Sequence, residues 1–522
     1  MDRRIYNIMF NLHTVSSIII SVAVFVIFFA GTFSFFRDEI VNWERGHQVE
    51  TQEEIDANID TLLTALGEQH NLYGRDLTLN LYYNERRVSV NMSGSKDTTA
   101  LEEDKVGAFF YLDTQDHSTA TYTESYSLGE FLYRLHFFAQ IPYPYGYHLS
   151  GFVAFFLLFA VITGLIVHWD KIVANFFVFR PGAKWKTIWT DSHTALGLIG
   201  FPFQFVYALT GAYFMLQAFQ AAPFLLALYN EDNAAMNKDL GLDTPVYEFS
   251  YGKMDTLPFL TPFVEKTMEE WPSFRIHDVH VYNYGDANMH MELGGTLPFK
   301  EKFNGEGKIT YKVKDGTHVL KKDPKEKASY ITVVSNLLYK LHLADYASLG
   351  LRIISFILGL LSCYVVVSGV MIWLVARDKK LTSDKERRFN QRVVWWYLAI
   401  CMSMYPVTAL EFSLVKLFPG GGMGFLYRTY FISWLLLSLL FGWKKDNAFI
   451  LKWSLLLGGI MGLLVPLVNG LTTGKWIWVS WLEGYDQILL IDLLWLVLSA
   501  TSMWATLRLS SKTNQNILAR ST

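Results

Sequence analysis

The chain has 522 residues, of which 51% are hydrophobic, 16% aromatic and only 18% charged, a composition typical of a membrane protein. Its net charge of -3, without a basic stripe interleaved with aromatics, gives no case for a nucleic-acid partner. Both cysteines, Cys363 and Cys401, lie in apolar runs, which rules out a disulfide framework or a cysteine-based metal site.

Eight apolar runs are long enough to cross a bilayer, whose core of roughly 30 Å requires about 20 helical residues. The first run follows Arg3 and Arg4 and is too long for a signal-peptide core, so it is predicted to be an uncleaved anchor. The predicted spans are residues 14–36, 148–169, 194–217, 350–376, 393–415, 426–443, 449–468 and 487–508.

Lysine and arginine gather in the short loops 170–192 and 376–393 and at Lys444 and Lys445. By the positive-inside rule these loops and both termini face the cytoplasm. The two long soluble stretches, 40–135 and 218–340, then lie in the periplasm. Each has a helix-like segment followed by alternating, strand-like runs, which predicts two periplasmic α+β modules.

The sequence contains one unit twice: a span that begins at a histidine, a soluble stretch, an LYxLH motif and a second span. The motif reads LYRLH at Leu132–His136 and LYKLH at Leu338–His342. His13 and His193 open the first span of each copy, and a glycine follows each of them 18 residues later. The repeat therefore comprises 1–36, 40–135, 136–217, 218–340 and 341–376, and residues 393–508 form a four-helix extension.

Histidines near a bilayer are candidates for a functional site. The predicted topology places His13, His168 and His193 at cytoplasmic ends of spans, and His136, His148 and His342 at periplasmic ends. Neutral imidazoles suit haem iron, and two ligands per iron require two facing helices. The repeat pairs His13 with His193 and His136 with His342, with His168 and His148 as alternates.

Anionic haem propionates near lipid would require cations. Arg134 and Lys340, two places before the motif histidines, and Arg352 are the candidates near the periplasmic pair. Arg3, Arg4 and Arg180 would serve the cytoplasmic pair. In the extension, Glu411 and Asp492 would either relay protons or pair with Lys416.

The histidine-headed spans, the intervening modules and the repeated LYxLH motif resemble the PepSY-associated transmembrane proteins over residues 1–376. Within that family the chain is similar to the iron-regulated siderophore reductases of the bacterial inner membrane. This resemblance implies two haem b groups, and the chain has no CxxCH for covalent attachment. It also implies electron transfer from the cytoplasmic side to an Fe(III)-siderophore in the periplasm.

The cytoplasmic loops contain no dinucleotide fingerprint and are too short for a flavin domain. Electrons would therefore come from a separate soluble reductase or a membrane quinol. Two other functions remain open from the sequence. One is a membrane-anchored binding or regulatory protein without redox activity, and the other is a transporter, as the internal repeat suggests.

Overall fold

The computed structural model describes residues 2–49, 58–81, 83–169, 172, 177–178, 180, 182–242, 245–379 and 381–521, with only the helical backbone for 510–521. The chain divides into two compact units. A helical unit comprises residues 1–48, 127–223 and 339–522, and a sheet unit comprises residues 49–126 and 224–338.

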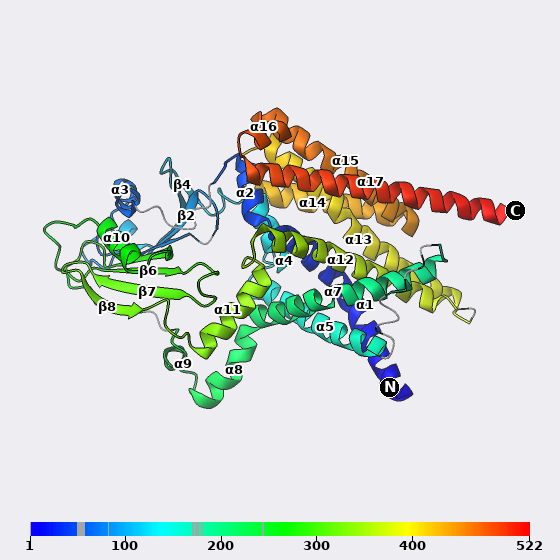
Figure 1. Cartoon of the computed structure of the whole chain (residues 1–522), viewed down its shortest axis with the longest axis horizontal. Coiled ribbons are helices and arrows are strands. Elements are labelled where there is room, and N and C mark those ends of the chain that lie inside the picture. The colour runs from blue at the N-terminus through cyan, green and yellow to red at the C-terminus, as the bar shows by residue number, and fades with distance from the viewer. Residues whose placement is uncertain are drawn as a thin grey trace. The chain divides into compact units, whose positions relative to one another are not determined.

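The described residues include eight helices that are long and apolar enough to cross a membrane, which confirms the predicted polytopic class (Figure 1). They are α1 (Arg3–Ser34), α5 (Tyr145–His168), α7 (Trp185–Met215), α12 (Ser348–Arg377), α13 (Asp384–Leu417), α14 (Gly422–Lys444), α15 (Asn447–Thr473) and α17 (Asp486–Ser521). Each predicted span overlaps one of them. Because α1 and α7 begin well before His13 and His193, these histidines lie inside their helices and not at the first residue.

The four spans of the repeat close on one another. Helices α1 and α7, which are equivalent in the repeat, each pack against both α5 and α12. In the extension α13 packs against α14 and α15, and α15 packs against α17. The ring formed by α1, α5, α7 and α12 places repeat-equivalent residues of α1 and α7 opposite each other.

Shorter helices connect the spans. The LYxLH motifs end α4 (Leu128–His136) and nearly end α11 (Tyr330–Leu343). A left-handed glycine, Gly46, terminates α2 (Arg37–Arg45), which directly follows α1. Two further short helices, α8 (Gln217–Leu228) and α9 (Asn233–Asp239), follow α7, and α16 (Ile477–Leu482) precedes α17.

The sheet unit contains one antiparallel sheet with strand order β4-β3-β2-β1-β5-β6-β7-β8. Its first half consists of α3 (Ile59–Gln69), β1 (Leu77–Asn80), β2 (Arg87–Met92), the 3-10 turn η1 (Glu102–Lys105), β3 (Ala108–Asp113) and β4 (Thr119–Thr121). Its second half consists of α10 (Thr261–Glu270), β5 (Arg275–Tyr282), β6 (His290–Thr296), β7 (Glu306–Lys312) and β8 (Thr317–Lys322).

Each predicted module is thus a helix followed by a four-stranded meander, but the two are fused. Strand β1 pairs with β5, with Leu79 opposite Val279. In two separate modules β1 and β5 would each be an edge strand with unpaired backbone groups, and here they bond to each other. Alternate residues of the strands form one apolar core with α3 and α10. The helix-like segment predicted in the first soluble stretch is residues 52–71, and its part 52–57 lies outside the described residues.

Candidate functional site

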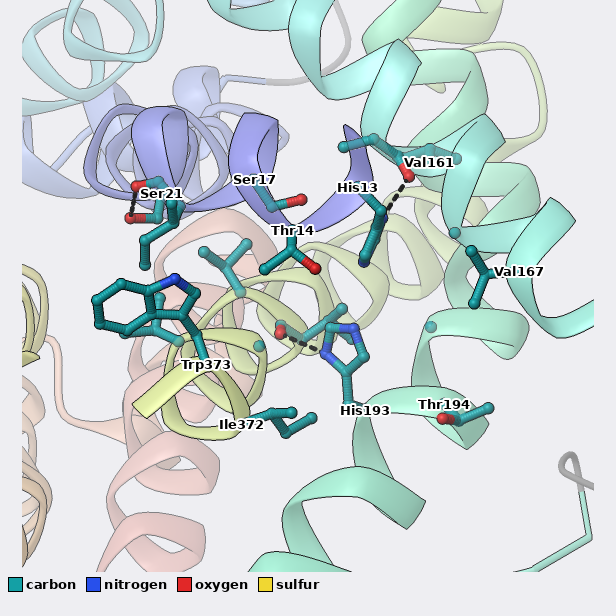
Figure 2. Close-up of a pocket in the computed structure, with 18 of the residues that line it drawn as sticks. His13, Thr14, Ser17, Ser21, Val161, Val167, His193, Thr194, Ile372 and Trp373 are labelled. Carbon is teal, nitrogen blue, oxygen red and sulfur yellow. Dashed lines mark hydrogen bonds between the residues drawn. The ribbon is translucent and has the colours of Figure 1, made fainter. Parts of the chain in front are cut away.

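The arrangement of α1, α5, α7 and α12 places His13 and His193 opposite each other. Their imidazole rings point toward each other from α1 and α7, and the ring centroids are 6.3 Å apart (Figure 2). An imidazole nitrogen binds a first-row metal at about 2 Å, so two axial rings on one ion have centroids about 6 Å apart. The separation therefore fits a single iron atom between the two rings.

Hydrogen bonds hold both rings in the orientation that a metal ligand requires. Nδ1 of His13 donates to the Ala160 carbonyl at 2.8 Å, and Nδ1 of His193 donates to the Val365 carbonyl at 3.0 Å. A proton on Nδ1 leaves Nε2 unprotonated and able to bind iron. Ala160 and Val365 are 205 residues apart, the same offset that aligns α5 with α12, so the repeat preserves this contact.

Two glycines at equivalent positions of α5 and α12 make room for these rings. A Cβ atom added at Gly164 would lie 3.0 Å from Cε1 of His13, and one added at Gly369 would lie 3.1 Å from Cε1 of His193. Both distances are tighter than ordinary van der Waals contact. Any side chain at either position would therefore press on a ring.

The first pair lies in a cavity of about 440 Å³. This volume is within the usual range for cofactor sites, and the wall is mostly apolar, as haem requires. The wall includes Val24, Phe28, Leu157, Leu198, Val366 and Val370. The alternate ligand His168 also lines this cavity, as does Arg377, which stacks on Trp373 at 4.4 Å. Sequence reasoning placed Arg377 only among the loop cations, although its position at the end of a span could have suggested a propionate partner.

His136 and His342 form the second pair, with ring centroids 5.8 Å apart. Nδ1 of His136 donates to the Ile27 carbonyl at 3.1 Å, and Nδ1 of His342 donates to Oγ1 of Thr210 at 2.7 Å. Loss of hydration lowers the pKa of both imidazoles, and the neighbouring His136 lowers that of His342 further, to about 3. Both rings are therefore neutral at pH 7, the form that binds metal.

The repeated glycine of α1 has a role at this second pair. A Cβ atom added at Gly31 would lie 2.5 Å from Nδ1 of His136, which is too close for any side chain. A Cβ atom added at its repeat equivalent, Gly211, would instead lie 3.3 Å from the Cβ atom of Ala154. The equivalence in sequence therefore does not extend to the contact that each glycine makes.

Two of the three predicted propionate partners near the second pair form ion pairs. Arg134 contacts Glu130 at 2.8 Å, and Arg352 contacts Glu39 at 2.7 Å. Lys340 lies two residues before His342 in the last turns of α11. The contact of these cations with propionates stays a prediction.

Two residues that the sequence left open are also placed by the structure. The alternate ligand His148 contacts the Phe219 ring at 4.9 Å and the Met215 carbonyl at 3.3 Å. Arg180, expected near the first pair, contacts Asp191 at 2.8 Å. Among the described residues no group of three or more His, Cys, Asp or Glu side chains is arranged to hold a metal ion.

Comparison with known proteins decides the family. The model of the PepSY-associated TM region matches residues 10–376, which include all four paired histidines. The chain belongs to this family. No curated protein matches the chain. The matched region ends inside α12, so the extension α13–α17 lies beyond the part that this PepSY-associated protein shares with the family model.

Proposed function

We propose that this protein is a di-haem oxidoreductase of the bacterial inner membrane that reduces Fe(III)-siderophore in the periplasm. The observation that supports this best is the pair of bis-histidine arrangements, with ring centroids 6.3 and 5.8 Å apart and every Nδ1 atom hydrogen-bonded to an oxygen. Bound haem b would supply one-electron chemistry between ferric and ferrous iron. His13 with His193, and His136 with His342, would each hold one haem iron, and an iron held by two imidazoles would favour electron transfer over oxygen binding.

The two pairs are stacked along α1. Ile27, whose carbonyl accepts from His136, lies 14 residues after His13, which is about 21 Å along a helix axis. The apolar cavity of the first pair extends along α1 as far as Phe28, next to Ile27. The path from one pair to the other therefore runs inside the bundle and is largely apolar.

Aromatic side chains connect this cavity with the second pair. Phe28 stacks on Phe203 at 6.3 Å, Phe203 contacts Tyr207 at 4.2 Å, and Tyr207 contacts His342 at 5.0 Å. An electron that passed between the two pairs would therefore have a series of aromatic rings along its path.

Reduction releases iron because hard oxygen donors hold the ferric ion more tightly than the ferrous ion. The second pair would face the periplasm, where the exposed rings of Tyr143 and Tyr145 offer a surface for a bulky chelate. Tyr147 accepts a hydrogen bond from Arg134 at 3.1 Å beside them. The electron donor would be a separate reductase or a membrane quinol on the cytoplasmic side, where both termini would lie.

The first test is an absorption spectrum of the detergent-purified protein, oxidised and dithionite-reduced, with pyridine haemochrome quantitation. We expect low-spin b-type bands from two haems per chain. The reduced protein would then be mixed with an Fe(III)-siderophore, and reoxidation would be followed at the haem bands. The Ga(III) complex of the same siderophore is the matched control, because Ga(III) is not reduced. A colourless protein, or reoxidation that does not depend on Fe(III), would overturn the proposal.

A further inference from the structure

The helix α4, which ends at His136, packs directly against the C-terminal extension. The buried ring of Phe131 contacts Tyr430 of α14 at 4.7 Å and Phe431 of the same helix at 5.8 Å. The Tyr430 hydroxyl is in turn hydrogen-bonded to Thr408 of α13 at 3.1 Å. His136 lies five positions after Phe131 in the same helix, which is about 1.4 turns.

The extension also holds α2 through buried polar contacts. Nε1 of Trp43 donates to Oδ1 of Asp492 at 2.9 Å, and Asn469 donates to Oδ2 of the same carboxylate at 3.0 Å. Nζ of Lys416 donates to the Trp43 carbonyl. Trp43, Asn469 and Asp492 are fully buried, and every one of these contacts joins α2 to the extension or joins two extension helices. Such a network fixes the position of α2, because movement of α2 away from the extension would break these hydrogen bonds and leave buried polar groups unsatisfied.

Helix α2 is linked to α4 in its turn. Arg37 forms a buried ion pair with Glu130 at 2.9 Å, and Glu44 accepts a hydrogen bond from the first backbone N–H of α4, that of Leu128, at 2.7 Å. Gly129 allows the close approach, since a Cβ atom there would lie 2.5 Å from the Arg37 carbonyl oxygen. Helix α4 is therefore held at its N-terminus by α2 and along its side by α14.

The other helix of the second pair, α11, is supported by α7 and not by the extension: its Tyr339 stacks on Phe214 of α7 at 4.5 Å. All residues of α11 are described, and none of them is buried. His342 is positioned by its own contacts, chiefly Thr210 and Tyr207. The two histidines of this pair are thus held in different ways, although the repeat makes them equivalent.

We propose that the extension α13–α17 is a positioning scaffold for His136, acting through α14 and through α2 on the orientation of the imidazole at the periplasmic site. This inference rests on the proposed function, because the periplasmic haem is where the positioning would matter. It gives the C-terminal third of the chain, which the family model does not match, a role in the redox site. Tyr430, Trp43 and Asp492 are positioning residues and would not touch the haem.

The test compares Phe131→Ala and Trp43→Phe with the parent protein. Phe131→Ala removes the contact with α14. Trp43→Phe removes the N–H group that donates a hydrogen bond to Asp492 and keeps a large aromatic ring. We expect the periplasmic haem to dissociate roughly tenfold faster in Phe131→Ala, a change that corresponds to about 1.4 kcal/mol. Its low-spin signals in electron paramagnetic resonance should also change. The haem between His13 and His193 should be unaffected, and it serves as an internal control in the same molecule.

The matched control variant is Leu436→Ala, which truncates a side chain of α14 that is 61% exposed. It should leave both haems as they are in the parent. Phe131→Leu, which keeps apolar volume beside Tyr430, should restore most of the slow dissociation. Equal changes at both haems, or no change at either, would overturn the inference.

A readout that does not require haem separates this inference from the proposed function. Hydrogen exchange of the amides of residues 128–136 in the purified protein should be faster in both variants than in the parent. If the parent contained no haem, the proposed function would fail, while faster exchange would still show that the extension orders α4. Unchanged exchange would overturn the positioning role in either case.

Discussion

Nδ1 of His342 donates to the hydroxyl of Thr210 at 2.7 Å, whereas His13, His136 and His193 each donate to a main-chain carbonyl. Nδ1 of His193 also lies 3.1 Å from the Ser368 hydroxyl, in addition to its carbonyl acceptor. The Thr210 hydroxyl itself donates to the Val206 carbonyl at 2.6 Å, so it acts as the acceptor toward the imidazole. A hydroxyl is a weaker acceptor than an amide carbonyl and leaves less negative charge on the ring. Less charge on an axial ligand stabilises ferric iron less and raises the potential of the bound haem.

The haem held by His136 and His342 should therefore have the higher potential, which favours electron flow toward it. Thr210→Val removes the acceptor and should raise this potential further, by roughly 20–60 mV, if a hydrogen bond contributes about 0.5–1.5 kcal/mol and 59 mV corresponds to a tenfold change for one electron. Spectroelectrochemical titration of both haems measures this. Thr210→Ser, which keeps the hydroxyl, should behave as the parent does, and a fall in potential in Thr210→Val would contradict the argument.

Removal of one histidine should remove one haem. His136→Ala or His342→Ala should leave about one haem per chain, the one bound by His13 and His193, and His13→Ala should leave the other. Haemochrome quantitation against protein concentration gives the ratio. His280→Ala, a substitution in the sheet unit, is the control and should retain two haems per chain. If both single variants at the second pair kept full haem content, the assignment of that pair would be wrong.

A methyl group at Gly31 should disturb His136. The added Cβ atom would lie 2.5 Å from Nδ1, so Gly31→Ala must displace the ring or the helix, and overpacking of this kind costs about 1–3 kcal/mol. We expect weaker retention of the second haem during gel filtration. The control is Gly350→Ala, at a helical glycine with no atom within 4 Å of the added carbon, and this variant should retain the second haem as the parent does. Equal retention in the two variants would show that the ring is free to shift without loss of binding.

The sheet unit should lose part of its stability in acid. Hydrogen bonds from Asn71 and Arg75, each 3.0 Å long, hold the pKa of Asp104 below its usual value. A carboxylate with a lowered pKa in the folded state stabilises the protein above its unfolded-state pKa, and that contribution is lost as the pH falls through the folded-state pKa. Asp104→Asn should therefore unfold at a lower temperature than the parent at pH 7.

The difference between Asp104→Asn and the parent should disappear below the pKa of Asp104 in the folded protein. Thermal unfolding of the full chain, followed by near-ultraviolet circular dichroism at several pH values, gives this comparison. The exposed Asp255→Asn substitution is a suitable control at each pH. A difference that persisted unchanged into strong acid would show that the substitution acts through packing and not through charge.

The sequence by itself determined the membrane class and the eight spans, and it predicted the pairing of histidines through the repeat. These follow from local properties: bilayer thickness sets the length of an apolar run, and a repeated unit places equivalent residues at equivalent depths. The geometry of His13 with His193, and of His136 with His342, agrees with that pairing.

Only the tertiary structure decided which atoms hold those histidines and what the remaining polar groups do. The partners of Nδ1 are main-chain carbonyls, a threonine and a serine on other helices, and nothing in the sequence near a histidine encodes them. Arg352 forms an ion pair with Glu39, and Asp492 accepts a hydrogen bond from Trp43, because folding joins elements that are far apart in the chain. For the same reason the fusion of two predicted modules into one sheet was not predictable. Strand pairing depends on which open edges meet, and a strand pattern specifies its buried face but not its neighbour.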